Sequence, residues 1–406
     1  MATSLGSFLL LLAFSLPSTL VSYSDPDLFA DVRSIVESRG FPLEEHFVTT
    51  ADGYILTVHR IRSPRLARLR RPVILQHGLL CTSREFMINA PGGFIYESTS
   101  VVGNNMAFEL AKHGYDVWLP NSRGNTYSRN HTTLDPSRDK EFWNFSFDEM
   151  VRYDAPAVVD YVIAVTRRLT VGFIGHSQGT TILFGLLASR PEYNDVLKPC
   201  IALAPITVVG HSVTPYSYLA YVPFLVKLID KYGGPFLPSN RLMKLIASRL
   251  CTSCLKKICS NAVFMANGFN EEQMNLTRLG VYASGFPAGT SARNMVHFAQ
   301  AVLSRRFARF DYGDRNMQVY GSREAPEYPL ENITSRHIIV FLSQNDWLSN
   351  PRDTDILVQR LRVPLHKRFT IPVKSWNHLD FLLAKQAGRH VNRPILAILE
   401  KYNKFR

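Results

Sequence analysis

The sequence contains few cysteines, no internal repeats and, beyond its N-terminus, no long hydrophobic run. Five cysteines in 406 residues are too few for a fold that depends on a framework of disulfides. After the N-terminal segment no stretch reaches the ~20 apolar residues that a membrane-spanning helix needs. Low-complexity tracts are also missing, and 46% hydrophobic with 19% charged residues is the composition of an ordinary globular protein. We therefore expect a sizeable core and no transmembrane anchor.

Acidic residues are fewer than basic ones. The formal net charge is +13, from 46 basic and 33 acidic residues, and such a charge favours contact with anionic surfaces. No aromatic motif is interleaved with the basic residues, so nucleic-acid binding is not indicated. We interpret the densest run as a solvated loop in preference to a lipid-interface patch. That run consists of Arg60, Arg62, Arg65, Arg68, Arg70 and Arg71.

Three of the cysteines, Cys251, Cys254 and Cys259, are clustered within nine residues. No His or Asp nearby completes the four ligands of a structural zinc site, so we expect no metal. One disulfide inside the cluster is the favoured alternative in an oxidising compartment. Cys81 and Cys200 are then expected to be buried thiols.

The N-terminus is the one place where a long uncharged apolar segment occurs. Leu5–Val21 contains no charge and is followed by small and polar residues, which is typical of a secretory signal peptide, here residues 1–22. Its first residues lack the usual Lys or Arg, but Ser15 and Pro17 interrupt the apolar core, which favours cleavage over anchoring. Four N-x-S/T sequons agree with entry into the secretory pathway and with an extracellular or lysosomal destination. They begin at Asn130, Asn144, Asn275 and Asn332.

Short runs of β-branched and aliphatic residues recur along the chain, each followed by a helical or turn segment. This alternation predicts an α/β protein whose mainly parallel sheet is covered by helices on both faces. A hairpin around Asp52-Gly53 precedes these runs, and a helix over Asp27–Arg39 precedes the hairpin. The predicted strands lie at Val73–Gln76, Tyr115–Leu119, Val171–Ile174, Ile201–Leu203, Ile338–Leu342 and Arg368–Val373.

The alternation is interrupted between about Ile206 and Arg336, where clear strands are missing. This stretch combines aromatic and proline-rich sequence, the cysteine cluster and helical pieces such as Ala292–Leu303. We therefore predict a core domain formed by residues 23–205 and 336–406, with residues 206–335 inserted as a helical cap or lid.

The segment around Ser177 predicts a strand, a sharp turn and a helix. Gly175-His-Ser-Gln-Gly179 is a G-x-S-x-G pentapeptide, and apolar residues flank it on both sides. Glycine is required two residues before and after the serine because a Cβ there would block the crossing of helix and strand. The serine hydroxyl then lies near a helix N-terminus, which favours developing negative charge. We predict that Ser177 is a nucleophile.

A serine nucleophile needs a base, and the base needs an acid that orients it. In this class of fold both follow the serine in the order acid, histidine. Asp346 ends the predicted strand Ile338–Leu342 and its following turn, and His378 lies in a loop after a later strand. The rivals are less well placed. Asp353 and Asp355 are expected to be solvated carboxylates on a helix, and Asp380 is too close to His378 in sequence.

The oxyanion hole requires two backbone N–H donors. Gln178, directly after the nucleophile, supplies one of them. The other is expected from the loop after the strand Val73–Gln76, where Leu79 is best placed. The proposed chemistry requires no cofactor.

Several longer motifs give the chain a family resemblance. It resembles, over about residues 26–400, the acid lipase family of the α/β-hydrolase fold, which includes gastric lipase and lysosomal acid lipase. The motifs are Leu75-Gln-His-Gly-Leu-Leu80, Gly114-Tyr-Asp-Val-Trp-Leu119, Asn121-Ser-Arg-Gly-Asn-Thr126, Glu141-Phe-Trp143, Phe145-Ser-Phe-Asp-Glu-Met150, Gly175-His-Ser-Gln-Gly179, Pro287-Ala-Gly-Thr290 and Asn377-His-Leu-Asp-Phe381. One departure is a longer segment around Ala90–Val101, next to the oxyanion loop.

The resemblance implies that this chain is a serine lipase that acts through an acyl-enzyme. Its substrates would be triacylglycerols or cholesteryl esters at a lipid–water interface, beneath a mobile cap. The family's catalytic positions match Ser177, Asp346 and His378, and its oxyanion donors match Leu79 and Gln178. Its single disulfide matches Cys251–Cys259. We expect a monomer.

Other functions are compatible with parts of this pattern. They are a carboxylesterase for small soluble esters, a peptidase on the same scaffold, and a non-catalytic lipid carrier or storage protein. An apolar stretch around Pro215–Leu228 favours a lipid interface. We expect this stretch to cover Ser177 in water, because exposure of so many apolar side chains is costly. Its residues include Tyr216, Tyr218, Leu219, Tyr221, Val222, Phe224, Leu225 and Leu228.

Overall fold

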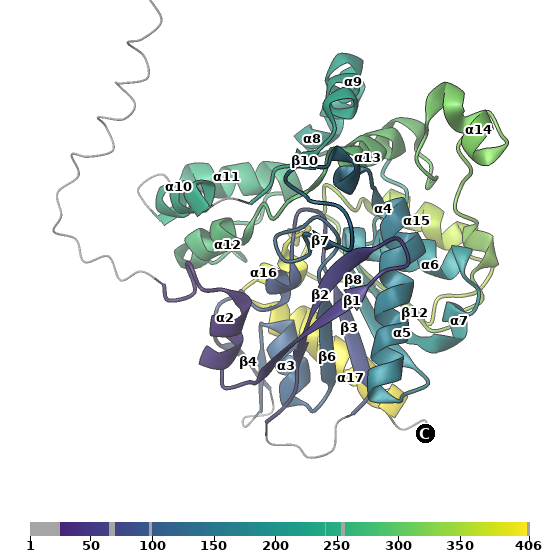
Figure 1. Ribbon diagram of the computed structural model, residues 1–406. Coiled ribbons are helices and arrows are strands. Elements are labelled where there is room, and N and C mark those ends of the chain that lie inside the picture. Colours follow the sequence, from purple (N-terminus) through teal and green to yellow (C-terminus); the bar gives the residue numbers. More distant parts are fainter. Residues whose placement is uncertain (1–24, 65–69, 97–99, 240, 253–255, 404–406) are drawn as a thin grey trace, which may run out of the picture.

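A single large sheet organises the molecule, with helices on both of its faces and further helices above one edge (Figure 1). The computed structural model describes residues 25–64, 70–96, 100–239, 241–252 and 256–403. The predicted signal peptide, residues 1–22, lies outside the described residues, and so does Cys254.

The sheet has nine strands, and its long path runs β1-β2-β6-β3-β8-β9-β12-β13, with β7 paired to β2. From β6 to β13 all neighbours are parallel, whereas β1, β2 and β7 pair antiparallel. This is the mainly parallel sheet that the sequence predicts. The strands are β1 Leu43–Thr49, β2 Tyr54–Ile61, β3 Pro72–Gln76, β6 Asp116–Pro120, β7 Asn130–His131, β8 Val171–His176, β9 Leu197–Leu203, β12 Ile338–Leu342 and β13 Lys367–Thr370.

Alternate residues of the central strands enter two separate hydrophobic cores. In β12, Ile339 and Phe341 pack on one face with helices α2, α3 and α17, and Val340 packs on the other with α5, α6 and α15. Successive side chains of a strand point to opposite faces, so a strand buried on both faces must be apolar throughout. These helices are α2 Val32–Ser38, α3 Met106–Lys112, α5 Ala155–Thr166, α6 Gln178–Ser189, α15 Pro351–Arg360 and α17 Arg393–Asn403.

The predicted strands and the hairpin are confirmed, except that the last strand ends at Thr370 and not at Val373. The first helix is also shorter than expected. It begins at Val32 rather than at Asp27. Asp31 is its N-cap and accepts the Ser34 N–H at 2.8 Å. Asp27 is buried and pairs with Arg39 and Arg278. These tertiary contacts hold the residues before the helix in a turn.

Residues 206–335 are mainly helical, and their only paired strands among the described residues are β10 Pro235–Phe236 and β11 Thr290–Ser291. Most of the helices lie above the carboxyl edge of the sheet (Figure 1). Toward the end of the segment, Phe307, Tyr328 and Leu330 pack in the core beside α5 and α6. The helices are α8 Pro215–Tyr218, α9 Pro223–Tyr232, α10 Arg241–Thr252, α11 Lys256–Asn267, α12 Leu279–Gly285, α13 Ala292–Ser304 and α14 Asn316–Tyr320.

Aromatic side chains before and within α9 are exposed, whereas we expected this apolar stretch to be shielded from water by packing over Ser177. Tyr221 is 53% exposed and Phe224 is 75% exposed. Helix α9 contacts α13 and the turn before it and projects from the top of the molecule (Figure 1). No residue of α9 is buried. The helix rests on neighbouring helices and leaves its aromatic side chains in solvent.

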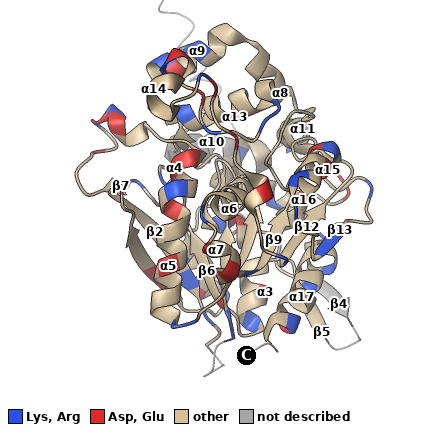
Figure 2. Cartoon of the chain, turned by 90° about the vertical axis from the view of Figure 1, so that its right-hand side faces the viewer, with Lys and Arg blue, Asp and Glu red and all other residues tan. Residues whose placement is uncertain are grey.

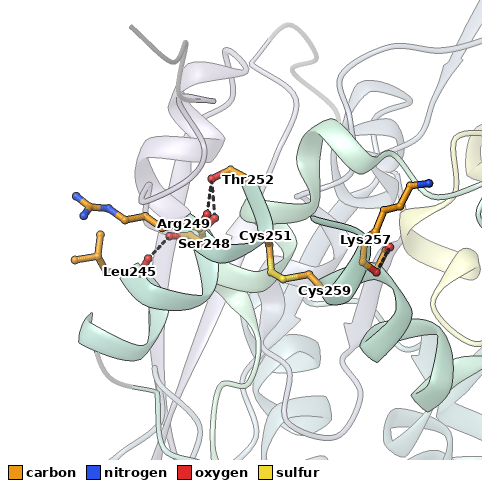
Figure 3. Close-up of a disulfide and its surroundings, with 8 residues drawn as sticks. Leu245, Ser248, Arg249, Cys251, Thr252, Lys257 and Cys259 are labelled. Carbon is orange, nitrogen blue, oxygen red and sulfur yellow. Dashed lines mark hydrogen bonds between the residues drawn. A yellow bond between two sulfur atoms is a disulfide. The ribbon is translucent and has the colours of Figure 1, made fainter. Parts of the chain in front are cut away.

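A disulfide between Cys251 and Cys259 joins the end of α10 to the start of α11 (Figure 3). This is the pairing that the family resemblance implies. Of the two remaining described cysteines, Cys200 is buried as expected, whereas Cys81 is only half-buried. Cys81 lies in the loop after β3, where part of its surface reaches solvent.

The segment around Ala90–Val101, which is the departure from the family pattern, packs against helical parts of the chain. Its described residues form a hairpin of β4 Gly93–Tyr96 and β5 Ser100–Gly103. The hairpin packs beside α3 and the turn at residues 388–392, where Gly103 accepts a hydrogen bond from Asn392 at 2.7 Å.

The basic run is not a solvated loop throughout. Arg60 lies in β2, is half-buried and donates two hydrogen bonds of 2.8 Å to Asp116. Arg71 donates to the carbonyls of Lys198 and Tyr402. Lys and Arg are spread over many elements of the molecule instead of gathering in one patch (Figure 2).

The four sequon asparagines all reach the surface. Asn130, Asn144 and Asn332 are exposed, and Asn275 is partly exposed. The structure therefore presents each of them where a glycan could be attached.

Candidate active site

Ser177 stands at the sharp turn between β8 and α6. Its backbone has φ +54° and ψ −121°, a strained conformation for a residue with a side chain. A Cβ on Gly175 would lie 2.6 Å from the backbone of Gly179, and one on Gly179 would lie 2.3 Å from the Gln76 carbonyl oxygen. Both glycines are therefore required by close approach, as the sequence predicts.

Asp346 and His378 are in direct contact. The Nδ1 of His378 lies 2.8 Å and 3.0 Å from the two carboxylate oxygens of Asp346, and both side chains are buried. Asp346 also accepts the N–H groups of Leu348 and Ser349 at 2.9 Å and 2.7 Å. Since a carboxylate only accepts, Nδ1 carries a proton. The Nε2 of His378 has no hydrogen-bond partner among the described residues.

The nucleophile turn and the His378 loop are joined through the residue before the serine. Nε2 of His176 lies 3.1 Å from the carbonyl oxygen of His378, and the centroids of the two rings are 5.0 Å apart. Ser177, Asp346 and His378, which are far apart in sequence, therefore belong to one site at the carboxyl edge of the sheet.

The loop after β3 lies against the same site. A Cβ on Gly78 would be 3.1 Å from the Cβ of Ser177. Leu79 is the next residue in the chain after this close contact. Leu80 has φ +59°, and its carbonyl accepts the Ala288 N–H at 2.7 Å. Gln178 begins α6, and its side-chain oxygen accepts from Asn294 at 2.8 Å. The segments of both candidate oxyanion donors are thus anchored.

This arrangement of strand, elbow, acid and base belongs to a known fold family. The family model described as "alpha/beta hydrolase fold" matches residues 71–384, and the model "Partial alpha/beta-hydrolase lipase region" matches residues 32–90. The human lysosomal acid lipase/cholesteryl ester hydrolase is 36% identical over 387 residues, which cover 93% of this chain and 92% of that protein. The chain belongs to the acid lipase family of α/β-hydrolases.

Further relatives place the chain among carboxylic ester hydrolases. Human gastric triacylglycerol lipase is 36% identical over 392 residues, with 93% of each chain covered. A solved structure of a proposed lipase from Sulfolobus solfataricus superposes with a TM-score of 0.53 at 13% identity, covering 88% of this chain and 99% of that one. That likeness concerns the fold alone. The chain is therefore an ester hydrolase of the lipase and esterase type that acts on lipid esters.

The rival carboxylates have other partners. Asp353 is not solvated as expected but buried, and Nδ1 of His211 lies 2.6 Å from its Oδ1. Asp355 pairs with Arg368 at the surface. Asp380 accepts the Asn377 N–H at 2.8 Å and the Asn270 amide at 2.6 Å, and burial raises its pKa to about 7. Of these carboxylates, only Asp346 is hydrogen-bonded to the His378 ring in the described structure.

Sequence reasoning missed the support that the helical segment gives to the acid and base loops. The carbonyl oxygen of Asn267, at the end of α11, accepts the N–H groups of His378 at 3.2 Å and of Trp347 at 3.4 Å. Gly268 follows with φ +108°, and a Cβ there would lie 2.2 Å from the Asn345 carbonyl oxygen. The only sequence signal is the glycine itself, which identifies a turn but not its partners.

Two charged or titratable residues beside the nucleophile were also missed. Glu85 is buried, and its Oε1 accepts the Gly78 N–H at 3.1 Å. The same oxygen lies 3.4 Å from Nδ1 of His176. Glu85 stands nine residues after Gln76 in no recognisable motif, so the sequence gave no reason to select it.

The described residues show neither a metal-binding cluster nor a membrane-spanning helix. No group of three or more His, Cys, Asp or Glu side chains in them could hold a metal ion. No helix of the described chain has the length and apolar character needed to cross a bilayer.

Proposed function

We propose that this acid lipase hydrolyses triacylglycerols, cholesteryl esters or both through a Ser177–His378–Asp346 triad and an acyl-enzyme. The observation that carries the proposal is the buried Asp346–His378 pair, whose Nε2 has no partner among the described residues. Next to it stands a serine on a strained elbow. A fixed Nδ1–H tautomer leaves the Nε2 lone pair as the base for the serine hydroxyl.

In the first half-reaction Ser177 Oγ forms a bond to the ester carbonyl carbon while its proton passes to Nε2 of His378. The negative charge on the former carbonyl oxygen is held by the backbone N–H groups of Leu79 and Gln178, each worth about 2.7–4 kcal/mol in the transition state. His378 then gives its proton to the departing alcohol oxygen, and the acyl group remains on Ser177. Asp346 stabilises the imidazolium but does not take its proton.

In the second half-reaction a water molecule attacks the acyl-enzyme. His378 removes a proton from that water and returns it to Ser177 Oγ as the carbon–oxygen bond breaks. The products are a fatty acid and the free serine. No cofactor or metal is needed for this sequence of steps.

Neutral lipids are supported as substrates by the family and by the surface. The relatives are named for cholesteryl esters and triacylglycerols. Tyr218, Tyr221 and Phe224 are close together in sequence and present exposed apolar surface. Such a surface suits contact with a lipid interface. We assign residues 206–335 as a cap, with its helices α8–α13 as the mobile part, and residues 23–205 and 336–406 as the core domain.

The same proposal includes the cellular route. Residues 1–22 would direct the chain into the secretory pathway, with N-glycans on one or more of Asn130, Asn144, Asn275 and Asn332. The mature enzyme would act as a monomer, outside the cell or in the lysosome. The disulfide between Cys251 and Cys259 suits such an oxidising route.

A serine-directed phosphonate and a substrate panel test the function. The phosphonate should label Ser177 alone, and the Ser177→Ala variant should not react. The panel contains triolein, cholesteryl oleate, p-nitrophenyl butyrate and a peptide. We expect hydrolysis of the first two; activity confined to p-nitrophenyl butyrate would indicate a carboxylesterase, and peptide cleavage would indicate a peptidase. Labelling at another residue would refute the triad.

A further inference from the structure

A buried carboxylate and a buried imidazole meet directly behind the nucleophile. Glu85 lies in the short turn Ser83–Phe86 after β3, and His176 is the last residue of β8. Their side chains are 9% and 2% exposed, and Oε1 lies 3.4 Å from Nδ1. The catalytic steps derived above use neither group. Burying charged groups is costly unless they are paired, so their placement here calls for a role.

Through these two side chains, three functional segments are tied together. Oε1 of Glu85 accepts the N–H of Gly78, the residue before the oxyanion donor Leu79. His176 precedes the nucleophile, and its Nε2 lies 3.1 Å from the carbonyl oxygen of His378. The pair therefore holds the oxyanion loop, the nucleophile elbow and the base loop at once.

The hydrogen bonds define where the protons are. A carbonyl oxygen only accepts, so Nε2 of His176 donates to His378 and must carry a proton. Nδ1 then faces the Glu85 oxygen at 3.4 Å, which is unfavourable if both bring a lone pair. A second proton on Nδ1 turns this contact into an ion pair.

We propose that Glu85 and His176 are positioning residues that form a buried ion pair, which fixes the oxyanion loop and keeps a positive charge beside the His378 ring. The inference rests on the proposed function. The centroids of the His176 and His378 rings are 5.0 Å apart. Glu85 lies beside Nδ1 of His176, and Nε2 of His176 faces the carbonyl oxygen of His378. The cation therefore stands between the carboxylate and the base. Like charges repel, so a positive charge there disfavours a second one on the His378 ring.

The pKa values of Glu85 and His176 shift in the directions that an ion pair requires. Burial alone would raise the pKa of Glu85, but the neighbouring His176 outweighs it and lowers that pKa. Burial alone would lower the pKa of His176, but Glu85 outweighs it and raises that pKa. Both directions favour the carboxylate with the imidazolium.

The other titratable groups that face the pair are His77, Cys81, His378 and Asp346. Nε2 of His77 accepts the Ser122 N–H at 3.0 Å, and burial lowers the His77 pKa, so this ring is neutral. Burial and the Glu85 charge raise the Cys81 pKa, so this thiol is neutral. Asp346 is already paired with His378. His176 is therefore the available countercharge for Glu85.

The Glu85→Gln variant tests the pair. Glutamine can still accept the Gly78 N–H, but it removes the negative charge, so His176 loses its second proton. We expect the acid limb of kcat/KM for p-nitrophenyl butyrate, measured from about pH 4 to 8, to move upward by about one pH unit. The plateau at higher pH should fall only a few-fold. An acid limb that stays in place, or an equal loss at every pH, would overturn the proposal.

Glu109→Gln is the matched control. Glu109 is also buried, accepts a glycine N–H (Gly103, 2.8 Å) and lies 3.4 Å from a histidine Nδ1 (His113), but it belongs to α3, away from the site. Its pH profile should overlay that of the unchanged enzyme. A similar shift in this variant would show that loss of any buried carboxylate moves the limb, and the proposal would fail.

A second measurement does not depend on the folding of Glu85→Gln. In the full-length enzyme with ¹⁵N-labelled histidines, NMR should show two protonated ring nitrogens for His176 at about pH 6, with the signal assigned by its loss in His176→Gln. A neutral His176 at that pH would refute the ion pair even if the triad is correct. Ester turnover by Ser177→Ala would instead refute the triad, whatever the state of His176.

Discussion

His211 and Asp353 connect the start of the inserted segment to the helix that follows the candidate acid. Nδ1 of His211 lies 2.6 Å from Oδ1 of Asp353, and Oδ2 of the same carboxylate accepts the His211 backbone N–H at 2.9 Å. Ser212 also donates to the Trp347 carbonyl at 2.9 Å. One end of the proposed cap is thereby held to the Asp346 loop.

Asp353→Asn should therefore weaken the junction and spare the chemistry. We expect kcat/KM for a soluble ester to change less than about three-fold, while the free energy of unfolding falls by about 1–3 kcal/mol because a buried charge-assisted contact is lost. Denaturant titration and steady-state kinetics measure the two effects. Asp346→Asn is the comparison, since it should lower turnover by orders of magnitude. Equal kinetic losses in both variants would contradict the assignment of Asp346 as the acid.

Members of the triad should act as a unit. Ser177→Ala and His378→Ala are each expected to remove nearly all ester hydrolysis, and the double variant should be little worse than either one. Circular dichroism and thermal unfolding should show that all three proteins remain folded. Losses that multiply in the double variant would mean that the two side chains act independently.

The elbow glycines should tolerate no side chain. In Gly179→Ala the new Cβ would lie 2.3 Å from the Gln76 carbonyl oxygen, so strand and helix must separate. We expect a loss of stability of about 3 kcal/mol or more together with loss of activity. Gly172→Ala in β8, the strand that leads into the elbow, is the control, because its Cβ would meet only side-chain atoms, the nearest at 3.3 Å. That variant should stay within about 1–2 kcal/mol of the unchanged protein.

The protonation of Asp380 should make the fold more stable in acid. Its pKa is raised from 3.8 to about 7 by burial, so the folded state binds a proton that the unfolded state releases. The stabilisation is fully present below about pH 4 and is lost as the pH rises through about 7. In a Ser177→Ala background, the unfolding free energy at pH 5 should exceed that at pH 8 by about 1–3 kcal/mol more than in the Asp380→Asn variant. An unchanged pH dependence would contradict the raised pKa.

The exposed aromatic side chains before and within α9 should matter only at a lipid surface. Replacing Tyr221 and Phe224 with serine should depress hydrolysis of emulsified triolein at least ten-fold and that of a dissolved short-chain ester less than two-fold, because apolar contact area is lost only at the interface. Leu169→Ser is the control: Leu169 is 88% exposed but precedes β8, at the opposite edge of the sheet. Equal losses on both substrates would show that Tyr221 and Phe224 serve the fold of the cap.

The sequence predicted those parts of the fold and site that depend on local pattern. Uninterrupted β-branched and aliphatic runs such as Ile338–Leu342 identify doubly buried strands, and they appear as predicted. The elbow could be predicted because the glycines on either side of Ser177 answer a steric demand that is visible in five residues. Asp346 and His378 were selected from chain order and position, and the structure brings these two into contact.

What could not be predicted depends on contacts between distant segments. The helix expected from Asp27 begins at Val32 because Asp27 is engaged by Arg278, 251 residues away. The burial of Asp353 depends on His211, and that of Glu85 on His176. A single carboxylate has the same local sequence signal whether it is solvated or paired. The outward direction of Phe224 depends on which face of α9 packs on α13, which periodicity alone does not determine.

The inserted segment leaves the sheet after β9 and returns at β12, and these two strands are direct neighbours, with Leu203 opposite Phe341. The inserted segment of more than a hundred residues therefore begins and ends at two adjacent strands. Its helical portion could be exchanged for that of another member of the family without rerouting the strands, provided that two sets of contacts are kept. Phe307 and Tyr328 fill the core. Asn267, Ala288 and Asn294 bond the loops of the site. Changes in the helical portion could thus alter which substrates reach the site while the residues of the proposed triad stay the same.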